Sequence, residues 1–369
     1  MTLRVAMIAL VALAFVAGAC ADSDDAGGDS ETTRPASPAA PKLTLEQQIG
    51  QHFVFPFSGT SPPRALLRRI ERGEAAGVIL FGRNVKSPAH LRRMTARLQQ
   101  IGQPQGLDLP LLVMIDQEGG LVKRLPGPPT RSASEMGASA GAQGAATARS
   151  LRRVGVNVNL APVVDVARAG SAMARERRAF GENAVTVSTR AGAFATALAA
   201  DGVAPALKHF PGFGAAVENT DQAPVRIGLS LQELRTVDLI PFERIDAPVV
   251  LLSSAVYPRV DPLPAAFSRR WIGNELRGRI GFDGVAMTDD LQTPAFAGLG
   301  TPVRLAGRAI AAGADIALFA QSYAEAERAA AGLAREVREG RLSRAALRDG
   351  VRRVLELRRR LGDPNQKVG

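Results

Sequence analysis

The chain has 369 residues, a formal net charge of +11 and a single cysteine, which excludes a disulfide bond within one chain. Its two Tyr and one Trp offer few side chains for stacking on bases, and this argues against a nucleic-acid-binding protein. Arginine supplies most of the positive charge. That pattern is typical either of attraction to anionic envelope polymers and lipid headgroups or of arginines spread over solvated helix faces, and we favour the second interpretation.

The N-terminus has the features of a secretion signal. Arg4 is followed by an apolar run over residues 5–19, which is shorter than the about 20 residues that span a bilayer. The run ends in Ala17-Gly18-Ala19-Cys20, which resembles a bacterial lipobox, in which the cysteine becomes the lipidated first residue. We therefore expect residues 1–20 to be a lipoprotein signal peptide and Cys20 to anchor the protein on the outer face of the cytoplasmic membrane. The alternative is an ordinary cleaved signal with a coincidental cysteine.

Residues 21–41 consist largely of Asp, Gly, Ser, Thr, Pro and Ala. A segment with so few bulky apolar side chains buries too little surface to offset its ordering entropy, so we expect a disordered acidic and proline-rich tether. Residues 42–369 are long enough for one large domain, which we expect to be monomeric.

Short apolar runs alternate with helix-period stretches through this domain. The expected strands are His52–Phe57, Gly77–Phe81, Leu111–Ile115, Val156–Pro162, Val203–Leu207, Val249–Ser253, Gly284–Met287 and Ile316–Phe319. The expected helices include Pro88–Ile101, Ala140–Val154, Thr186–Ala200, Arg269–Ile280, Pro302–Ala312, Tyr323–Arg338 and Ser343–Leu361. Apolar strands separated by helices predict a parallel sheet, and eight such units fit a (β/α)8 TIM-type barrel. No glycine-rich phosphate fingerprint follows the first strand, which argues against a dinucleotide-binding fold.

Polar residues follow five of the expected strands. They are Asp116-Gln117-Glu118-Gly119-Gly120, Asp165, Lys208-His209, Ser254 and Asp289-Asp290. In a barrel these groups project into one mouth, where active sites lie. A single Asp at a strand end is often only a helix N-cap, and we take that as the default interpretation of Asp165 and Asp290.

Three segments resemble glycoside hydrolase family 3, in its single-domain β-N-acetylglucosaminidase branch. Lys208-His209-Phe210-Pro211-Gly212-Phe213-Gly214 is similar to the family's Lys-His-Phe-Pro-Gly-His-Gly, and residues 116–124 match its Asp-x-Glu-Gly-Gly-x-Val-x-Arg. Residues 281–291, around Asp289-Asp290, resemble its nucleophile segment. The resemblance covers residues 42–361 and implies a barrel without metal or cofactor that acts on a carbohydrate substrate.

The resemblance also implies roles for individual residues. Asp289 matches the nucleophile of a retaining glycosidase, and the neighbouring Asp290 is expected to be held by a cap or hydrogen bonds. Arg178, in Arg178-Ala179-Phe180-Gly181, matches the family's Arg-Ser/Ala-Phe-Gly and its role as a sugar contact. The remaining sugar-binding matches are Asp116, Arg124, Lys208 and His209.

The chain departs from the family where the acid/base is expected. The family's second histidine is Phe213, its Asp-Ser-His is Asn219-Thr220-Asp221, and a further histidine of the family is replaced by Ser254. Asp221 is the expected acid/base, because carboxylic acids commonly take that role in glycosidases, and Glu218 is the alternative with a longer reach.

The implied activity is removal of terminal β-linked N-acetylglucosamine from cell-wall peptidoglycan fragments or related glycans. Two alternatives remain open on the sequence. One is a catalytically impaired sugar-binding pseudoenzyme of the cell envelope, and the other is a β-glycosidase of different sugar specificity.

Overall fold

The computed structural model describes residues 42–362, so the expected signal peptide, Cys20 and the tether lie outside the described residues. Eight parallel strands form the central sheet, in the order β11-β8-β7-β6-β3-β2-β1-β12. A parallel bridge between Met287 and Ile316 joins its two edges and closes it into a barrel. The strands are β1 (Phe53–Phe55), β2 (Gly77–Leu80), β3 (Leu112–Ile115), β6 (Val158–Asn159), β7 (Ala204–Phe210), β8 (Val249–Leu252), β11 (Val285–Thr288) and β12 (Ala317–Leu318).

The prediction of a (β/α)8 barrel is confirmed, and each barrel strand overlaps one of the eight expected apolar runs. Two small antiparallel hairpins were not expected: β4 (Gln117–Gly119) with β5 (Val122–Lys123), and β9 (Val256–Tyr257) with β10 (Asp261–Pro264).

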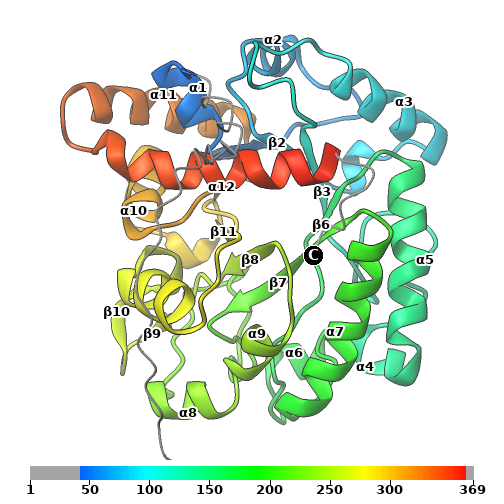
Figure 1. The fold of residues 1–369 in the computed structure, drawn as a ribbon. Helices are drawn as coiled ribbons and strands as arrows, with labels where there is room; N and C mark the ends of the chain where they lie inside the picture. Colours follow the sequence, from blue (N-terminus) through cyan, green and yellow to red (C-terminus); the bar gives the residue numbers. More distant parts are fainter. Residues whose placement is uncertain (1–41, 363–369) are drawn as a thin grey trace, which may run out of the picture. The chain divides into compact units, whose positions relative to one another are not determined.

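The helices surround the barrel (Figure 1). The longer ones are α2 (Arg64–Glu71), α3 (Pro88–Gln99), α5 (Ala140–Arg153), α7 (Ala184–Ala200), α10 (Pro302–Ala312), α11 (Tyr323–Arg338) and α12 (Arg344–Gly362). The stretch expected as a helix over 269–280 is a π-helix, η4 (Arg270–Arg279). The short helices are α1 (Leu45–Gly50), α4 (Ala133–Met136), α6 (Ala172–Arg175), α8 (Leu231–Thr236) and α9 (Ile240–Arg244).

Side chains along each strand point alternately into the barrel and toward the helices, so the hydrophobic core has an inner layer and an outer layer. In β3, for example, Leu112 and Met114 belong to the cluster inside the barrel, while Val113 and Ile115 pack against the surrounding helices. The helix α12 contributes Val354 and Leu357 to the inner cluster. It lies across the barrel at the end where the strands begin, which leaves the opposite end free for a site (Figure 1).

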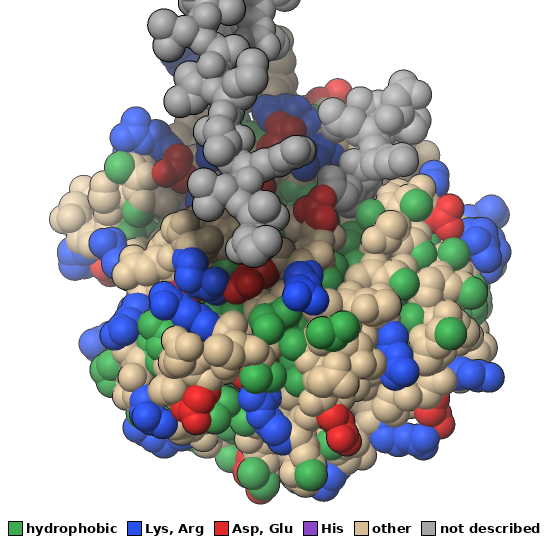
Figure 2. Space-filling view, turned by 60° about the horizontal axis from the view of Figure 1, so that its bottom comes forward, with side chains coloured by type: hydrophobic (Ala, Val, Ile, Leu, Met, Phe, Trp, Pro, Cys, Tyr) green, Lys and Arg blue, Asp and Glu red, His purple; other side chains and the backbone are tan. Residues whose placement is uncertain are grey.

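Charge is dispersed on the face shown in Figure 2, where basic side chains are interspersed with acidic ones. This distribution is what arginines on solvated helix faces would give on that face. Among residues 42–362, no helix is both long and apolar enough to cross a bilayer.

Candidate active site

A cavity of about 310 Å³ opens at the ends of the strands that lie opposite α12. That volume is at the lower end of the about 300–1,000 Å³ typical of small-molecule sites. All sequence-predicted catalytic and sugar-binding residues line it, namely Asp116, Arg124, Arg178, Lys208, His209, Asp221 and Asp289. Sequence reasoning gave no role to two further lining carboxylates, Glu118 and Glu176. Glu118 lay within a recognised motif, whereas nothing in the sequence pattern marked Glu176.

Lys208 lies at the base of the cavity between two carboxylates. Its Nζ is 2.8 Å from Oδ1 of Asp116 and 2.6 Å from Oε1 of Glu118, and its side chain is almost fully buried. Burial alone would lower the pKa of this amine, but the charges of Asp116 and Glu118 outweigh burial and raise it. Lys208 is therefore a fixed cation that can donate to a sugar hydroxyl without losing its proton.

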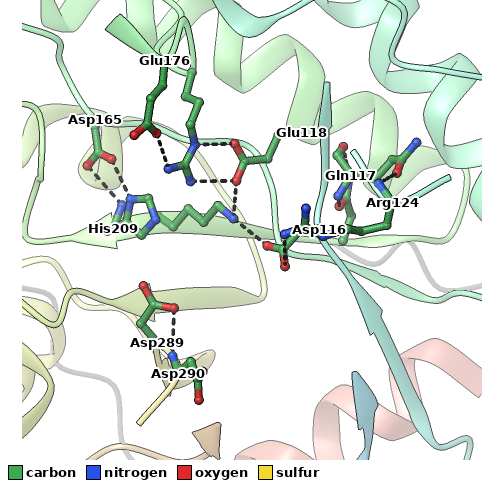
Figure 3. A network of polar contacts seen from close by, with 12 residues as sticks. Asp116, Gln117, Glu118, Arg124, Asp165, Glu176, His209, Asp289 and Asp290 are labelled. Carbon is green, nitrogen blue, oxygen red and sulfur yellow. Dashed lines mark hydrogen bonds and ion pairs between the residues drawn. The ribbon is translucent and has the colours of Figure 1, made fainter. Parts of the chain in front are cut away.

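Arg178 extends the same network on the other side of Glu118. Its Nε and Nη2 each donate to Glu118 at 2.9 Å, and its Nη1 donates to Glu176 at 3.1 Å. Burial would raise the pKa of Glu118, yet Arg178 and Lys208 hold it at about 2. Hydrogen bonds and ion pairs with Arg178 and Lys208 join Glu176, Glu118 and Asp116 into one connected row (Figure 3). Such a row of oriented donors and acceptors suits a polyhydroxylated ligand.

His209 is held by Asp165, a residue that the sequence pattern suggested to be a helix cap. That interpretation is wrong, because the buried carboxylate accepts hydrogen bonds from Nδ1 of His209 at 2.7 Å and from its backbone N–H at 3.1 Å. It also accepts from the backbone N–H of Phe213 at 2.7 Å. The three bonds fix both the imidazole and the start of the following loop. The interaction was missed because 44 residues separate the two partners.

The Pro-Gly loop after β7 is tightly packed. Phe213, which stands where the family has histidine, is buried with its ring edge-on to His209 at 5.8 Å between ring centroids. A Cβ on Gly214 would lie 1.9 Å from the carbonyl oxygen of Val166, so only glycine fits there. The hydroxyl of Tyr257 donates to the carbonyl of Gly212 at 2.8 Å. The expectation that Ser254 faces the barrel mouth is wrong, because its Oγ is buried with no hydrogen-bond partner among residues 42–362 and Ser253 lines the cavity instead.

The neighbouring carboxylates Asp289 and Asp290 follow β11 and have different surroundings. Asp289 points toward the row that contains Asp116 and His209, whereas Asp290 points away from it (Figure 3). Asp290 accepts from the backbone of Gln292 and Ala320 and from the side chain of Gln321, at 2.9–3.0 Å. It therefore braces the turns after β11 and β12 and is not a helix N-cap. Burial raises the pKa of Asp290 to about 6 despite these hydrogen bonds.

Asp221 lies on the loop over the cavity mouth. Asp221 is exposed to solvent, and it lines the cavity together with Asn219 and Thr220. Partial desolvation and the nearby charge of Asp289 raise the pKa of Asp221 above its ordinary value, against smaller opposing effects of Arg178 and His209. Glu218, the alternative donor, is exposed and does not line the cavity.

Aromatic and cationic groups also line the cavity. The guanidinium of Arg83 lies over the ring of Phe81 at 4.5 Å, and that of Arg124 lies 5.6 Å from the same ring. Arg124 also approaches Asp116 at 3.8 Å. Over the range that the structure describes, His, Cys, Asp and Glu side chains form no cluster of three or more suited to a metal ion.

A family model and two relatives in sequence all relate the chain to glycosyl hydrolases. Residues 44–357 match the glycosyl hydrolase family 3 N-terminal domain. The chain is 35% identical to an uncharacterised secreted glycosyl hydrolase of Arthroderma benhamiae, over 88% of this chain and 97% of that protein. It is 37% identical to a β-hexosaminidase of Pseudomonas aeruginosa, over 75% of this chain and 83% of that protein.

Solved structures show the same likeness. A β-N-acetylhexosaminidase of Beutenbergia cavernae superposes with a TM-score of 0.79 at 33% identity, over 86% of this chain and 98% of that one. A family 3 β-N-acetylglucosaminidase of Paenibacillus superposes with a TM-score of 0.80 at 30% identity, over 89% of this chain but only 66% of that longer one. The chain therefore belongs to glycosyl hydrolase family 3 and is an enzyme of the glycoside hydrolase class.

Proposed function

We propose that this protein is a retaining β-N-acetylhexosaminidase that removes terminal β-linked N-acetylglucosamine, with Asp289 as nucleophile and Asp221 as acid/base. This proposal depends on one observation about the two carboxyl groups. Both line the same cavity, and desolvation together with the charge of Asp289 raises the pKa of Asp221. A retaining glycosidase needs one carboxyl group as nucleophile and a second as acid/base, and a raised pKa favours the protonated form that the acid requires.

The proposed reaction has two steps. Asp289 attacks the anomeric carbon while Asp221 donates its proton to the glycosidic oxygen, which leaves with the aglycone as an alcohol. Asp221, now ionised, takes a proton from water, and the resulting hydroxide equivalent releases the sugar from the ester on Asp289. The charged row of Lys208, Asp116 and Arg178 would hold the sugar hydroxyls through both steps.

The nucleophile is tested by trapping and substitution. We expect a slow 5-fluoro glycosyl donor to label a peptide that contains Asp289, and Asp289→Asn to reduce p-nitrophenol release from the N-acetylglucosaminide below detection. Asp201→Asn, at a partly exposed helix end, is the matched control. A label on another residue, or turnover by purified Asp289→Asn, would contradict the assignment. A parent protein without turnover would contradict the proposed activity.

The acid/base is tested by comparing leaving groups. Asp221→Ala should lower kcat/KM on a β-linked disaccharide by roughly 10²–10⁴-fold, the usual contribution of general acid catalysis. It should lower kcat/KM much less on a p-nitrophenyl glycoside, whose leaving group departs without protonation. Glu218→Ala, three residues earlier on the same loop, is the matched control and should affect neither substrate strongly.

We further propose that the natural substrates are cell-wall fragments, because a lipoprotein signal, which the sequence of residues 1–20 leads us to expect, would deliver the enzyme to the cell envelope. Release of N-acetylglucosamine from purified peptidoglycan disaccharides, compared with release from chitobiose, tests this. A strong preference for chitobiose would speak against it.

A further inference from the structure

The loop that carries Asp221 is attached to the segment around α6 along its length. The backbone N–H groups of Arg168 and Ala172 donate to the carbonyls of Gly214 and Ala216, at 3.1 and 2.8 Å. The guanidinium of Arg175 then donates to the carbonyl of Val217 at 2.6 Å. The next contact in this series is between side chains, Glu176 and Asn219.

Asn219 connects Glu176 to the backbone of Asp221. Its Nδ2 donates to Oε1 of Glu176 at 3.1 Å, and its Oδ1 accepts from the backbone N–H of Asp221 at 3.0 Å. A carboxylate only accepts and a backbone N–H only donates, so the two contacts together determine the orientation of the amide. The carbonyl of Asn219 also accepts from the N–H groups of Gln222 and Ala223, which closes a tight turn around Asp221.

Glu176 is itself held in place by the sugar-binding row. Its Oε2 accepts from Nη1 of Arg178 at 3.1 Å, and its carboxylate lines the cavity. With Oε1 accepting from Asn219 and Oε2 from Arg178, both oxygens of Glu176 act as acceptors. The residue is thus arranged to fix its neighbours and not to donate a proton.

We propose that Glu176 and Asn219 are positioning residues that fix the turn carrying the acid/base Asp221. This inference rests on the proposed function and adds to it the means by which the acid is placed. An aspartate at position 219 could still accept from the Asp221 N–H, but its second oxygen would face the Glu176 carboxylate. The amide of Asn219 therefore supplies the donor that the Glu176 carboxylate accepts. The feature to test is the polarity of the pair, namely which of the two residues donates and which accepts.

The test exchanges that polarity. Asn219→Asp alone places two carboxylates against each other, and Glu176→Gln alone leaves one donor, from Asn219 or Arg178, facing the amide nitrogen. In the double variant the amide introduced at position 176 can accept from Arg178 and donate to the carboxylate introduced at position 219. That carboxylate can still accept from the backbone N–H of residue 221.

The expected losses follow from how far the acid is displaced. We expect Asn219→Asp to lose about 100-fold in kcat/KM on a β-linked disaccharide, within the range of general acid catalysis. The Glu176→Gln/Asn219→Asp variant should recover to within about tenfold of the parent, because each donor again faces an acceptor.

The leaving group separates positioning from general damage to the fold. On the p-nitrophenyl glycoside, kcat/KM reports a glycosylation step that needs no proton, so Asn219→Asp should lose only a few-fold there. Equal losses on both substrates, or a double variant no better than Asn219→Asp, would overturn the inference while an active parent leaves the proposed function standing. A parent inactive on both substrates would overturn both.

Discussion

Replacing the buried Asp165 by asparagine should move the ring proton of His209 from Nδ1 to Nε2. Asp165→Asn can keep its amide oxygen on the two backbone N–H groups that Oδ1 now serves, those of His209 and Phe213. Its NH₂ group then faces Nδ1 of His209, where the parent has a carboxylate oxygen at 2.7 Å. Since two donors cannot share that position, Nδ1 must become an acceptor and the ring proton must move to Nε2.

The expected cost follows from the bonds that change. All three charge-assisted hydrogen bonds to the carboxylate become neutral ones, so we expect Asp165→Asn to lower the free energy of unfolding by about 1–3 kcal/mol. Asp165→Ala would leave two buried N–H groups and one imidazole nitrogen unpaired, at about 1–3 kcal/mol each. That sum is a large part of the about 5–15 kcal/mol that holds a protein folded. The Nε2 atom that faces the cavity would then donate where it had accepted, and a mismatch of about 1–3 kcal/mol with a sugar hydroxyl should lower kcat/KM by about 10- to 100-fold.

The tautomer can be observed directly because the chain has only three histidines. Nitrogen NMR of histidine-labelled protein should show the proton on Nδ1 of His209 in the parent and on Nε2 in Asp165→Asn, with thermal melts and kinetics on the same samples. Asp201→Asn, in an exposed ion pair, is the control and should shift stability by less than about 0.5 kcal/mol. An unchanged tautomer together with parental stability and kcat/KM would refute the reasoning.

Three further outcomes are expected. Arg358 is buried and donates to two glutamine side chains and three backbone carbonyls, so Arg358→Met should cost about 3–5 kcal/mol in urea unfolding. Because the folded-state pKa of Asp290 is raised from 3.8 to about 6, its ionisation opposes folding above pH 6 and this penalty is relieved as the pH falls through 6 toward 4. Melts at about pH 5 and about pH 8 should therefore differ less for Asp290→Asn than for the parent. We also propose the lipid anchor at Cys20, for which Cys20→Ser should move the protein from the detergent phase to the soluble fraction, and identical partitioning would contradict it.

Much of the fold could be predicted because barrel strands carry a strong local signal. A strand buried on both faces is an almost unbroken apolar run, and all eight runs correspond to barrel strands. The hairpins β4–β5 and β9–β10 are too short to show any alternation, and they were not predicted. The buried residues of the π-helix η4, Trp271, Ile272, Glu275 and Leu276, recur four positions apart, which also suits one face of an α-helix. Because π-helices are rare, the sequence pattern favours an α-helix.

Site residues could be predicted where their type and place in a motif coincide. Asp116 and Asp289 each follow a strand and Lys208 lies near the end of β7, and the barrel brings strand ends to one mouth whatever the loops do. Asp165 follows a strand as well, but an aspartate there serves equally well as a helix cap. The choice between a cap and a partner for His209 depends on which backbone passes within about 3 Å, and local sequence does not contain that information.

The sequence also could not predict that Asn219 donates a hydrogen bond to Glu176. From the sequence, asparagine in place of the family's aspartate removes a charge that would support an imidazole, and the change suggests a weakened site. In the structure the charge is present on Glu176, 43 residues away, and Asn219 connects it to the backbone of Asp221. A carboxylic acid at position 221 needs no second anionic partner at position 219, since desolvation and the charge of Asp289 already raise its pKa. It needs a fixed position, and a neutral amide held between an acceptor and a donor can provide that without adding charge beside the acid.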